Sequence, residues 1–410
     1  MAIDNKDKKV LKSSIEREQN EVACSAECEK IKGSKNLNVP PLRFPEFTEE
    51  WKAEQLDNIA TLSKGIGISK EQLSEDGEPC ILYGELYTKY KSEIIKQVES
   101  KTDINGSKLK RSKANDVIIP CSGETAVDIA TARCVPFDNI LFGGDLNVIS
   151  LHQYDGAFMS YQLNGKRKYD IARVAQGVSI VHLYGEHLKA IKTYNPTLPE
   201  QQKIAKLLSL LDDRIDTQNK IIEKLQSLIK GIAQHCIKES TSGNTYVKLG
   251  DICQITTGKL DANAQVDNGI YPFFTCAEQP FKIDSFAFDT EALLISGNGA
   301  NLGYINYYKG KFNAYQRTYV LDLFSENIQY IKWALKVLLP KRIAIEKSSS
   351  NTPYIVLSTL TDLRLPIPCK SKQSFIANLM QSLERKLSNQ IAQYDSYNYL
   401  KQYLLRQMFI

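Results

Sequence analysis

Hydrophobic side chains recur at alternating steps of four and three residues in two long stretches of the chain, a pattern typical of a coiled-coil seam. The first stretch carries Ile204, Leu208, Leu211, Ile215, Gln218, Ile222, Leu225, Ile229, Ile232 and Cys236. The second, displaced by 172 residues, carries Ile376, Met380, Leu383, Leu387, Gln390, Tyr394, Tyr397, Lys401, Leu404 and Met408. The pattern predicts two long helices within residues 198–239 and 369–410, and about 38 helical residues at roughly 1.5 Å each make a rod of about 55–60 Å.

Two polar residues lie at seam positions and indicate how the helices are aligned. Gln218 and Gln390 occupy the same place in the two stretches, and buried polar seam residues fix helix register. If the helices pair antiparallel about this point, the two amides can bond to each other; the alternative is two glutamines at a wet helix edge. Lys401 stands where the first stretch has Ile229, the one clear departure from the pattern.

Each predicted helix follows a globular segment, and the two segments resemble each other. Leu56, Ile59 and Gly65 match Leu249, Ile252 and Gly258 at an offset of 193. The strand-like runs 116–120 and 292–295 are each followed by Ser-Gly, which matches Ser122-Gly123 with Ser296-Gly297 at an offset of 174. The change in offset predicts an internal duplication with about nineteen extra residues between Gly84 and Val117 of the first copy.

Composition and charge exclude several classes of protein. The 410 residues are 42% hydrophobic and 24% charged, with a net charge of +5, which is ordinary globular composition. No apolar run is long enough to span a membrane and the charged N-terminus lacks a signal peptide, so we expect a cytoplasmic protein. Residues 1–38 alternate charge and predict a mobile arm or a frayed helix. The nine cysteines do not indicate a disulfide framework, and Cys24 and Cys28 are too isolated for a zinc site.

The motifs of common catalytic sites are missing. No phosphate-binding loop, zinc-protease helix or nucleophile elbow occurs, and we expect no catalytic residue, no metal and no cofactor. The glycine-rich segment Gly297–Gly303 has the wrong spacing for a dinucleotide site and indicates a loop that approaches a backbone or a phosphate. Asn351–Tyr354 is similar to a loop of amino-methyltransferases, but no cofactor-binding segment accompanies it, so we interpret it as a turn.

Basic residues gather in both copies with tyrosines among them, a combination that favours nucleic acid. Lys and Arg neutralise phosphates, and Arg, Asn, Gln and Ser on loops can read base edges. The predicted DNA-binding residues are Lys64, Lys101, Lys108, Lys110, Arg111, Lys113, Lys166, Arg167, Lys168 and Arg173 in the first copy. In the second copy they are Lys259, Lys309, Lys311, Arg317, Lys341, Arg342 and Lys347.

Four further segments are distinctive: Pro41–Phe47 followed by Trp51, Tyr83–Tyr90, Leu198–Ile204 and Tyr315–Tyr319. They resemble segments of the specificity subunits of bacterial type I restriction–modification systems. The second helix entry, Pro366–Gln373, departs from the Pro-Glu-Gln-Gln pattern of the first.

The resemblance implies an α+β protein with two α/β target-recognition domains, at 39–197 and 240–368. They would be related by a pseudo-two-fold and separated by two long antiparallel coiled-coil helices. Each domain would read one half of a split site in double-stranded DNA, and the helices would set the gap and dock two modification (methyltransferase) subunits. Restriction subunits would complete the complex, and the chain itself would not be an enzyme.

Two other functions stay open. One is a self-contained DNA methyltransferase with a degenerate loop at Asn351–Tyr354, which predicts binding of S-adenosylmethionine. The other is a structural coiled-coil adaptor without DNA binding, in which the basic loops are plain surface. DNA affinity at low salt separates the adaptor from the recognition subunit.

Overall fold

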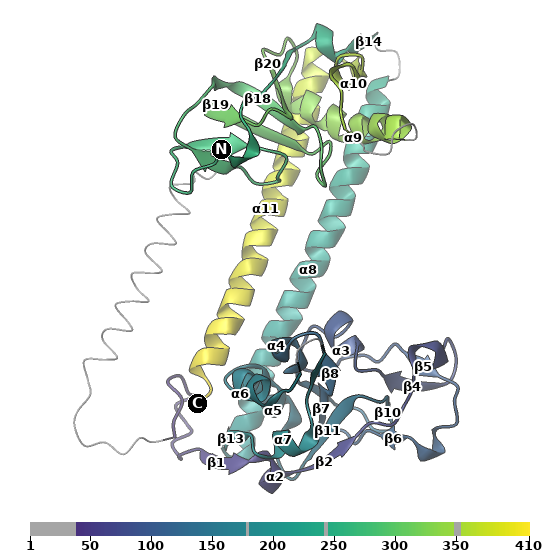
Figure 1. The fold of residues 1–410 in the computed structure, drawn as a ribbon, viewed down its shortest axis with the longest axis vertical. Helices are drawn as coiled ribbons and strands as arrows, with labels where there is room; N and C mark the ends of the chain where they lie inside the picture. Colours follow the sequence, from purple (N-terminus) through teal and green to yellow (C-terminus); the bar gives the residue numbers. More distant parts are fainter. Residues whose placement is uncertain (1–37, 178–179, 242–244, 348–353) are drawn as a thin grey trace, which may run out of the picture. The chain divides into compact units, whose positions relative to one another are not determined.

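The computed structural model describes residues 38–177, 180–241, 245–347 and 354–410. The expected N-terminal arm, apart from residue 38, and the pair Cys24 and Cys28 lie outside these ranges, as do residues 351–353 of the expected turn. The chain divides into two compact units, each combining sheet with helix (Figure 1). Unit 1 extends to Asp213 and also contains Asn398–Ile410, whereas unit 2 is Arg214–Tyr397. The α+β class expected from the sequence is confirmed.

Unit 1 is built on a four-stranded sheet in the order β2-β11-β7-β9. These strands are β2 (Ala60–Lys64), β11 (Leu146–Leu151), β7 (Asp116–Pro120) and β9 (Arg133–Val135). All five residues of β7 are buried, as expected of an uninterrupted apolar run at the centre of a sheet. The helices α4 (Ala126–Ile129), α5 (Gly156–Asn164), α6 (Lys168–Val174) and α7 (Gly185–Lys189) accompany this sheet.

A second, smaller sheet of unit 1 has the order β3-β5-β4-β10-β6. Its strands are β3 (Leu73–Ser74), β5 (Lys101–Thr102), β4 (Glu78–Ile81), β10 (Leu141–Phe142) and β6 (Lys110–Arg111). The short pairs are β1 (Lys52–Gln55) with β13 (Lys192–Asn195) and β8 (Ser122–Gly123) with β12 (Val181–His182). The short helices α2 (Leu56–Ile59) and α3 (Glu85–Thr88) complete the unit.

Unit 2 is built on a six-stranded sheet in the order β15-β20-β18-β19-β16-β17. The strands are β15 (Gln254–Thr257), β20 (Thr318–Asp322), β18 (Phe288–Ser296), β19 (Ile305–Ala314), β16 (Tyr271–Phe274) and β17 (Phe281–Ile283). Alongside them lie α9 (Ile328–Lys347), α10 (Leu357–Thr361) and the pair β14 (Thr245–Lys248) with β21 (Arg364–Ile367). Leu293, Ile295 and Leu321 of the sheet pack into one core with Trp333 and Leu335 of α9.

Strand pairing shows the duplication and corrects its alignment. Leu146 pairs with Pro120 in unit 1, and Thr318 pairs with Ser296 in unit 2. Since β11 and β20 correspond at an offset of 172, Pro120 corresponds to Ser296, an offset of 176. The expected match of Ser122-Gly123 with Ser296-Gly297 is therefore wrong by two residues, and the insertion is about seventeen residues long. A slip of two keeps every strand side chain on its own face, so the hydrophobic pattern could not exclude it.

The helix entries also recur, in their contacts as well as in their sequence. In unit 1 the amide of Gln201 accepts from the backbone N–H of Asp155 at 2.9 Å and donates to the carbonyl of Pro196 at 2.8 Å. In unit 2 Gln373 accepts from Asn327 at 3.0 Å and donates to Pro368 at 2.9 Å. The departure of Pro366–Gln373 from the motif thus spares the glutamine that ties each helix to its sheet domain.

The long helices are α8 (Leu198–Thr241) and α11 (Lys370–Gln407). Within unit 2 they run antiparallel: Gln218 bonds to Gln390, and Lys372 donates to the carbonyl of Glu239. The side-chain amide of Gln218 donates to Oε1 and to the backbone carbonyl of Gln390, both at 2.9 Å. Gln218 is buried, so it lies in the seam and not at a wet edge.

The buried face of α8 drifts along the helix. Ile204, Leu208, Ile222 and Leu225 are buried, but further along the buried residues are Ala233 and Ile237, and Ile232 and Cys236 are only half-buried. An α-helix has 3.6 residues per turn, so a straight helix drifts away from a 3.5-residue repeat. Of the other seam positions, Leu211 and Ile376 are buried, and Ile215, Leu383, Leu387 and Tyr394 are half-buried.

We expect Gln218→Ala to lower the free energy of unfolding by about 1 kcal/mol, because it removes two hydrogen bonds and leaves the Gln390 amide without this partner. Urea unfolding of the full chain measures the effect. Gln226→Ala is the matched control, since Gln226 is exposed on the same helix. Equal stabilities of the two variants would contradict a role for the amide pair.

Candidate nucleic-acid interface

The basic residues of the insertion in unit 1 are spread over the smaller sheet. Lys101 lies on β5 and Lys110 and Arg111 on β6, with strands β4 and β10 between them. Lys108 and Lys113 are exposed in the neighbouring loops. The Arg111 guanidinium donates to Glu78 at 2.5 and 3.0 Å, and this bond raises the pKa of Arg111. The sequence cluster is therefore not one compact patch, and Arg111 is already paired.

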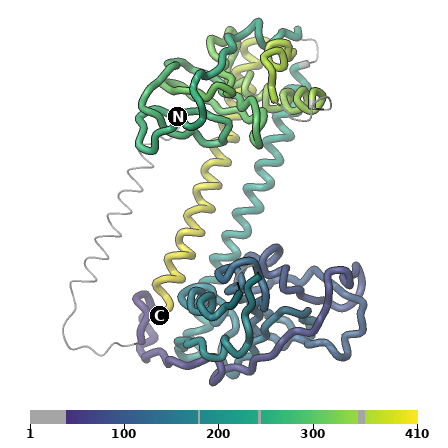
Figure 2. The backbone as a smooth tube through the Cα atoms, in the orientation of Figure 1, coloured from purple at the N-terminus to yellow at the C-terminus, as the bar shows by residue number. Residues whose placement is uncertain are grey.

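The residues around α6 serve the unit's own structure. Arg167 donates to the backbone carbonyl of Ile410 at 3.0 Å and pairs with Asp170 at 3.1 Å. Figure 2 shows the chain's yellow C-terminal end beside the purple segment near residue 40, where Leu42 donates to Gln407 at 2.9 Å. Arg173 also pairs with Asp170, and burial lowers the pKa of Lys168. Lys166, by contrast, is exposed.

The predicted basic residues of unit 2 lie on three elements. Lys309 and Lys311 are on β19, where Lys309 pairs with Glu291 and Lys311 lies 4.5 Å from the ring centre of Phe286. Lys341 and Lys347 are on α9, together with Arg342, which pairs with Glu346 at 2.8 Å. Lys259 and Arg317 remain, and the structure brings these two to one place.

Lys259 and Arg317 lie on two segments that are joined by a backbone hydrogen bond at the turn between β19 and β20. The backbone N–H of Gln316 donates to the carbonyl of Leu260 at 2.9 Å, and that of Gly297 donates to Arg317 at 2.9 Å. The loop after β18 adds Asn298, which accepts from the Cys276 thiol at 3.0 Å, and Asn301, which donates to the Cys276 carbonyl at 3.0 Å. We call Lys259, Cys276, Asn298, Asn301 and Arg317 the β18 turn cluster.

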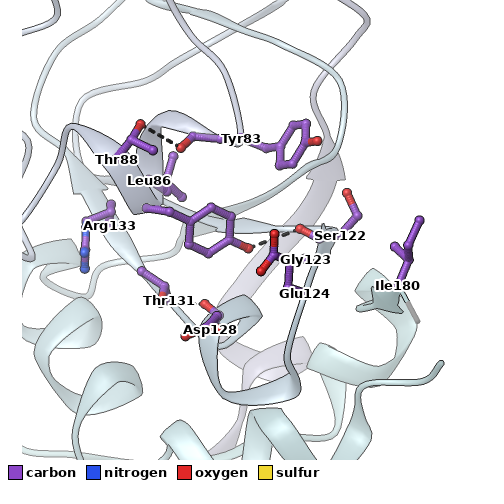
Figure 3. A pocket seen from close by; sticks show the side chains of 12 residues that line it. Tyr83, Leu86, Thr88, Ser122, Gly123, Glu124, Asp128, Thr131, Arg133 and Ile180 are labelled. Carbon is purple, nitrogen blue, oxygen red and sulfur yellow. Dashed lines mark hydrogen bonds between the residues drawn. The ribbon is translucent and has the colours of Figure 1, made fainter. Parts of the chain in front are cut away.

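Unit 1 has a cavity of about 910 Å³ at the corresponding end of its sheet. One wall is the segment Tyr83–Thr88 of the insertion, and the other is Ser122–Glu124 after β7 (Figure 3). Asp128, Thr131, Arg133 and Ile180 complete the lining. We call this cavity the β7 pocket. Its second wall corresponds, at the offset of 176, to the loop of the β18 turn cluster.

Hydrogen bonds hold the two walls of the β7 pocket together. The Tyr87 hydroxyl donates to the carbonyl of Ser122 at 3.1 Å, and burial raises the pKa of Tyr87. The buried carboxylate of Glu85 accepts from the backbone N–H of Leu82 at 3.0 Å and from Lys89 at 2.7 Å. The Tyr87–Ser122 bond thus joins the two walls, and the bonds of Glu85 hold the Tyr83–Thr88 wall itself.

The charges of the β7 pocket are separated by depth. Arg133 is buried and donates to the carbonyls of Tyr90 and Ala132 at 2.9 and 3.1 Å; burial lowers its pKa. Glu124 and Asp128 are exposed at the rim. Charge clustering could not identify these two acids, because they stand apart in the sequence, although both follow the Ser122-Gly123 motif closely.

Within the described ranges, no group of three or more His, Cys, Asp or Glu side chains is arranged to hold a metal ion. None of the helices in these ranges has a stretch long and apolar enough to cross a membrane.

Solved structures define the class of fold. The chain is similar to the S subunit of the type I restriction–modification system from M. genitalium, with a TM-score of 0.65 and 19% identity over 91% of this chain and 99% of that one. A second structure, from work on complex assembly and conformational transition of the type I system, has a TM-score of 0.55 at 16% identity, over 90% of this chain.

Sequence comparison defines the family. Residues 48–227 and 241–394 match the model described as type I restriction modification DNA specificity domain, so the chain belongs to this family, whose members are non-catalytic specificity subunits. The EcoDI specificity subunit of Escherichia coli is 44% identical over 137 residues, 33% of this chain and 30% of that subunit. The MjaVIII specificity subunit of Methanocaldococcus jannaschii is 23% identical over 401 residues, 84% of this chain and 87% of that subunit. The EcoDI match thus spans less than a third of that relative.

Proposed function

We propose that the chain is the DNA sequence-recognition subunit of a type I restriction–modification complex and that each recognition domain, 39–197 and 240–368, reads one half of a bipartite site. One observation carries this proposal: the same strand register is built twice, and the loops at its equivalent ends carry different side chains. One scaffold with two sets of loop residues is suited to binding two different short sequences of one polymer.

The long helices support the second part of the proposal, that they set the spacer between the half-sites and dock two modification subunits. Large apolar side chains stay exposed along them, with exposed fractions of 55% for Leu210, 53% for Leu228 and 67% for Phe375. Exposed apolar stripes of this kind mark surfaces that a partner covers. Restriction subunits would join the same assembly, and the modification subunits would supply the methyl-transfer chemistry.

Sequencing the methylated sites tests the proposal. The chain is co-expressed with its modification subunits, and residues 45–195 are then replaced by those of a relative. We expect a split motif in which only one half changes on replacement. A contiguous motif, or a change in both halves, would contradict the two-reader arrangement, and no DNA binding at low salt would leave the adaptor.

A further inference from the structure

The β7 pocket is a cavity to which the proposed function assigns no role, and its lining restricts what it can bind. At about 910 Å³ it lies in the range of small-molecule and cofactor pockets. Tyr83 and Tyr87 line one wall and are exposed by 39% and 37%, so a partner at the surface can reach this wall.

The charge of the rim restricts which part of a nucleic acid can bind there. Glu124 and Asp128 lie together at one side of the opening, with Tyr83 among the residues across from them (Figure 3). Their carboxylates repel phosphate groups and accept hydrogen bonds, so this rim suits a base edge that carries an amino group. Lys64, the exposed last residue of β2, pairs with Asn147 of β11, two residues after Asp145, and places a cation for a phosphate beside this turn.

Base chemistry then favours cytosine over adenine. The N4 amino group of cytosine is a donor with only a C–H beside it in the major groove. In adenine the N6 amino group stands next to N7, an acceptor that repels a carboxylate. Asp128 already accepts from the Thr125 hydroxyl at 2.6 Å, which fixes its carboxylate, whereas Glu124 extends from the loop and is exposed.

The counterpart in unit 2 carries the opposite hydrogen-bonding character. Glu124 corresponds to Ala300, and Asp145, whose carboxylate accepts from the Ser122 hydroxyl at 3.3 Å, corresponds to Arg317. The β18 turn cluster therefore offers the exposed guanidinium of Arg317 where unit 1 offers acids. Arginine pairs with O6 and N7 of guanine, the commonest specific base contact.

Resting on the proposed function, we propose that Glu124, with Asp128, is a specificity-determining residue that accepts a hydrogen bond from a cytosine of the first half-site. Arg317, which corresponds to Asp145 on the adjoining turn of unit 1, donates to a guanine of the second half-site. The two domains thus use neighbouring turns at the same end of the sheet, one with a hydrogen-bond acceptor and the other with a donor. No base needs to leave the duplex for either contact.

The experiment compares methylated motifs of complexes containing the full chain, as wild type and as E124Q, D128N, E124Q/D128N and R317Q. For the double variant we expect at least a tenfold loss of preference for cytosine at one position of the first half-site, with the second half unchanged. R317Q should relax one guanine of the second half only. E75Q is the control, because Glu75 is an exposed acid of the same unit outside the pocket.

Each other outcome has a distinct meaning. A first half-site without cytosine, an unchanged motif in E124Q/D128N, or an equal change in E75Q would overturn the proposal and leave the two-reader function intact. A wild-type motif that is contiguous would instead contradict the proposed function itself. Loss of all methylation in E124Q/D128N is resolved by melting: an unchanged melting temperature supports a binding role, and a lowered one overturns it.

Discussion

Replacing Lys401 with methionine is expected to lower the free energy of unfolding of unit 1 by about 3–5 kcal/mol, since breaking a buried ion pair leaves an uncompensated charge. Nζ of Lys401 lies 2.6 Å from Glu93 and 2.7 Å from Asp212, and all three side chains are almost fully buried. The Tyr161 hydroxyl donates to the other oxygen of Asp212 at 2.7 Å. Methionine matches the stem of lysine and removes only the cation.

The pH dependence of this effect has a definite sign. Burial raises the pKa of Asp212, Lys401 lowers it and Glu93 raises it, and the net value is about 6. Without Lys401 the folded-state pKa rises again, while the unfolded value stays near 4. The folded protein then binds more protons than the unfolded chain, so its stability falls as pH rises through this window. The loss caused by Lys401→Met should be larger at pH 8 than at pH 5.

Tryptophan fluorescence reports on unit 1 alone in a suitable background. The chain has two tryptophans, Trp51 in unit 1 and Trp333 in unit 2, so Trp333→Phe leaves Trp51 as the single reporter. Lys386→Met is the control, because Lys386 is exposed on the same helix and should change stability by less than about 0.5 kcal/mol. Equal effects of the two substitutions would show that the buried network does not stabilise unit 1.

Lys401 shows a limit of prediction from the sequence. The heptad pattern identified it as a departure, but its partner Glu93 belongs to the insertion of the first copy, 308 residues away. A second pair of distant segments also meets through buried groups: Arg43 and Trp51 both donate to the buried carboxylate of Glu200. Periodicity finds elements because it depends on local spacing. Pairs of this kind depend on tertiary packing, and the spacing of residues along the sequence carries no information about it.

The residues of the candidate site also fall into those that the sequence pattern could select and those that it could not. Charge clustering selected Lys64, Lys259 and Arg317 together with many lysines that the fold spreads over other elements. It could not select Glu124 or Asn298, since single polar residues in loops carry no pattern. Their signal is positional: each lies in the loop after a buried strand, β7 or β18, and these two loops are equivalent in the two copies. An alignment of the copies finds such positions only once strand pairing has set the register.

Gly65→Ala is expected to lower the stability of unit 1 by about 3 kcal/mol, at the upper end of what overpacking costs. A Cβ at this position would lie 1.9 Å from the carbonyl oxygen of Gly143, and the next atoms it meets also belong to backbone. The chain can relieve this contact only by moving the turn that precedes β11. The loss of stability should therefore be accompanied by weaker recognition of the first half-site, since Asp145 and the β7 pocket adjoin that turn.

The repeat explains why this glycine was found from sequence, and a neighbour supplies the control. Gly258 in unit 2 has the same restriction, with its Cβ 1.9 Å from the carbonyl of Ala314, so the matched glycines mark one close approach built twice. Gly67 has no atom within 4 Å of its Cβ position. In the Trp51 assay Gly67→Ala should stay within about 0.5 kcal/mol of the parent. If Gly65→Ala does the same, close backbone packing is not the reason for the repeated glycine.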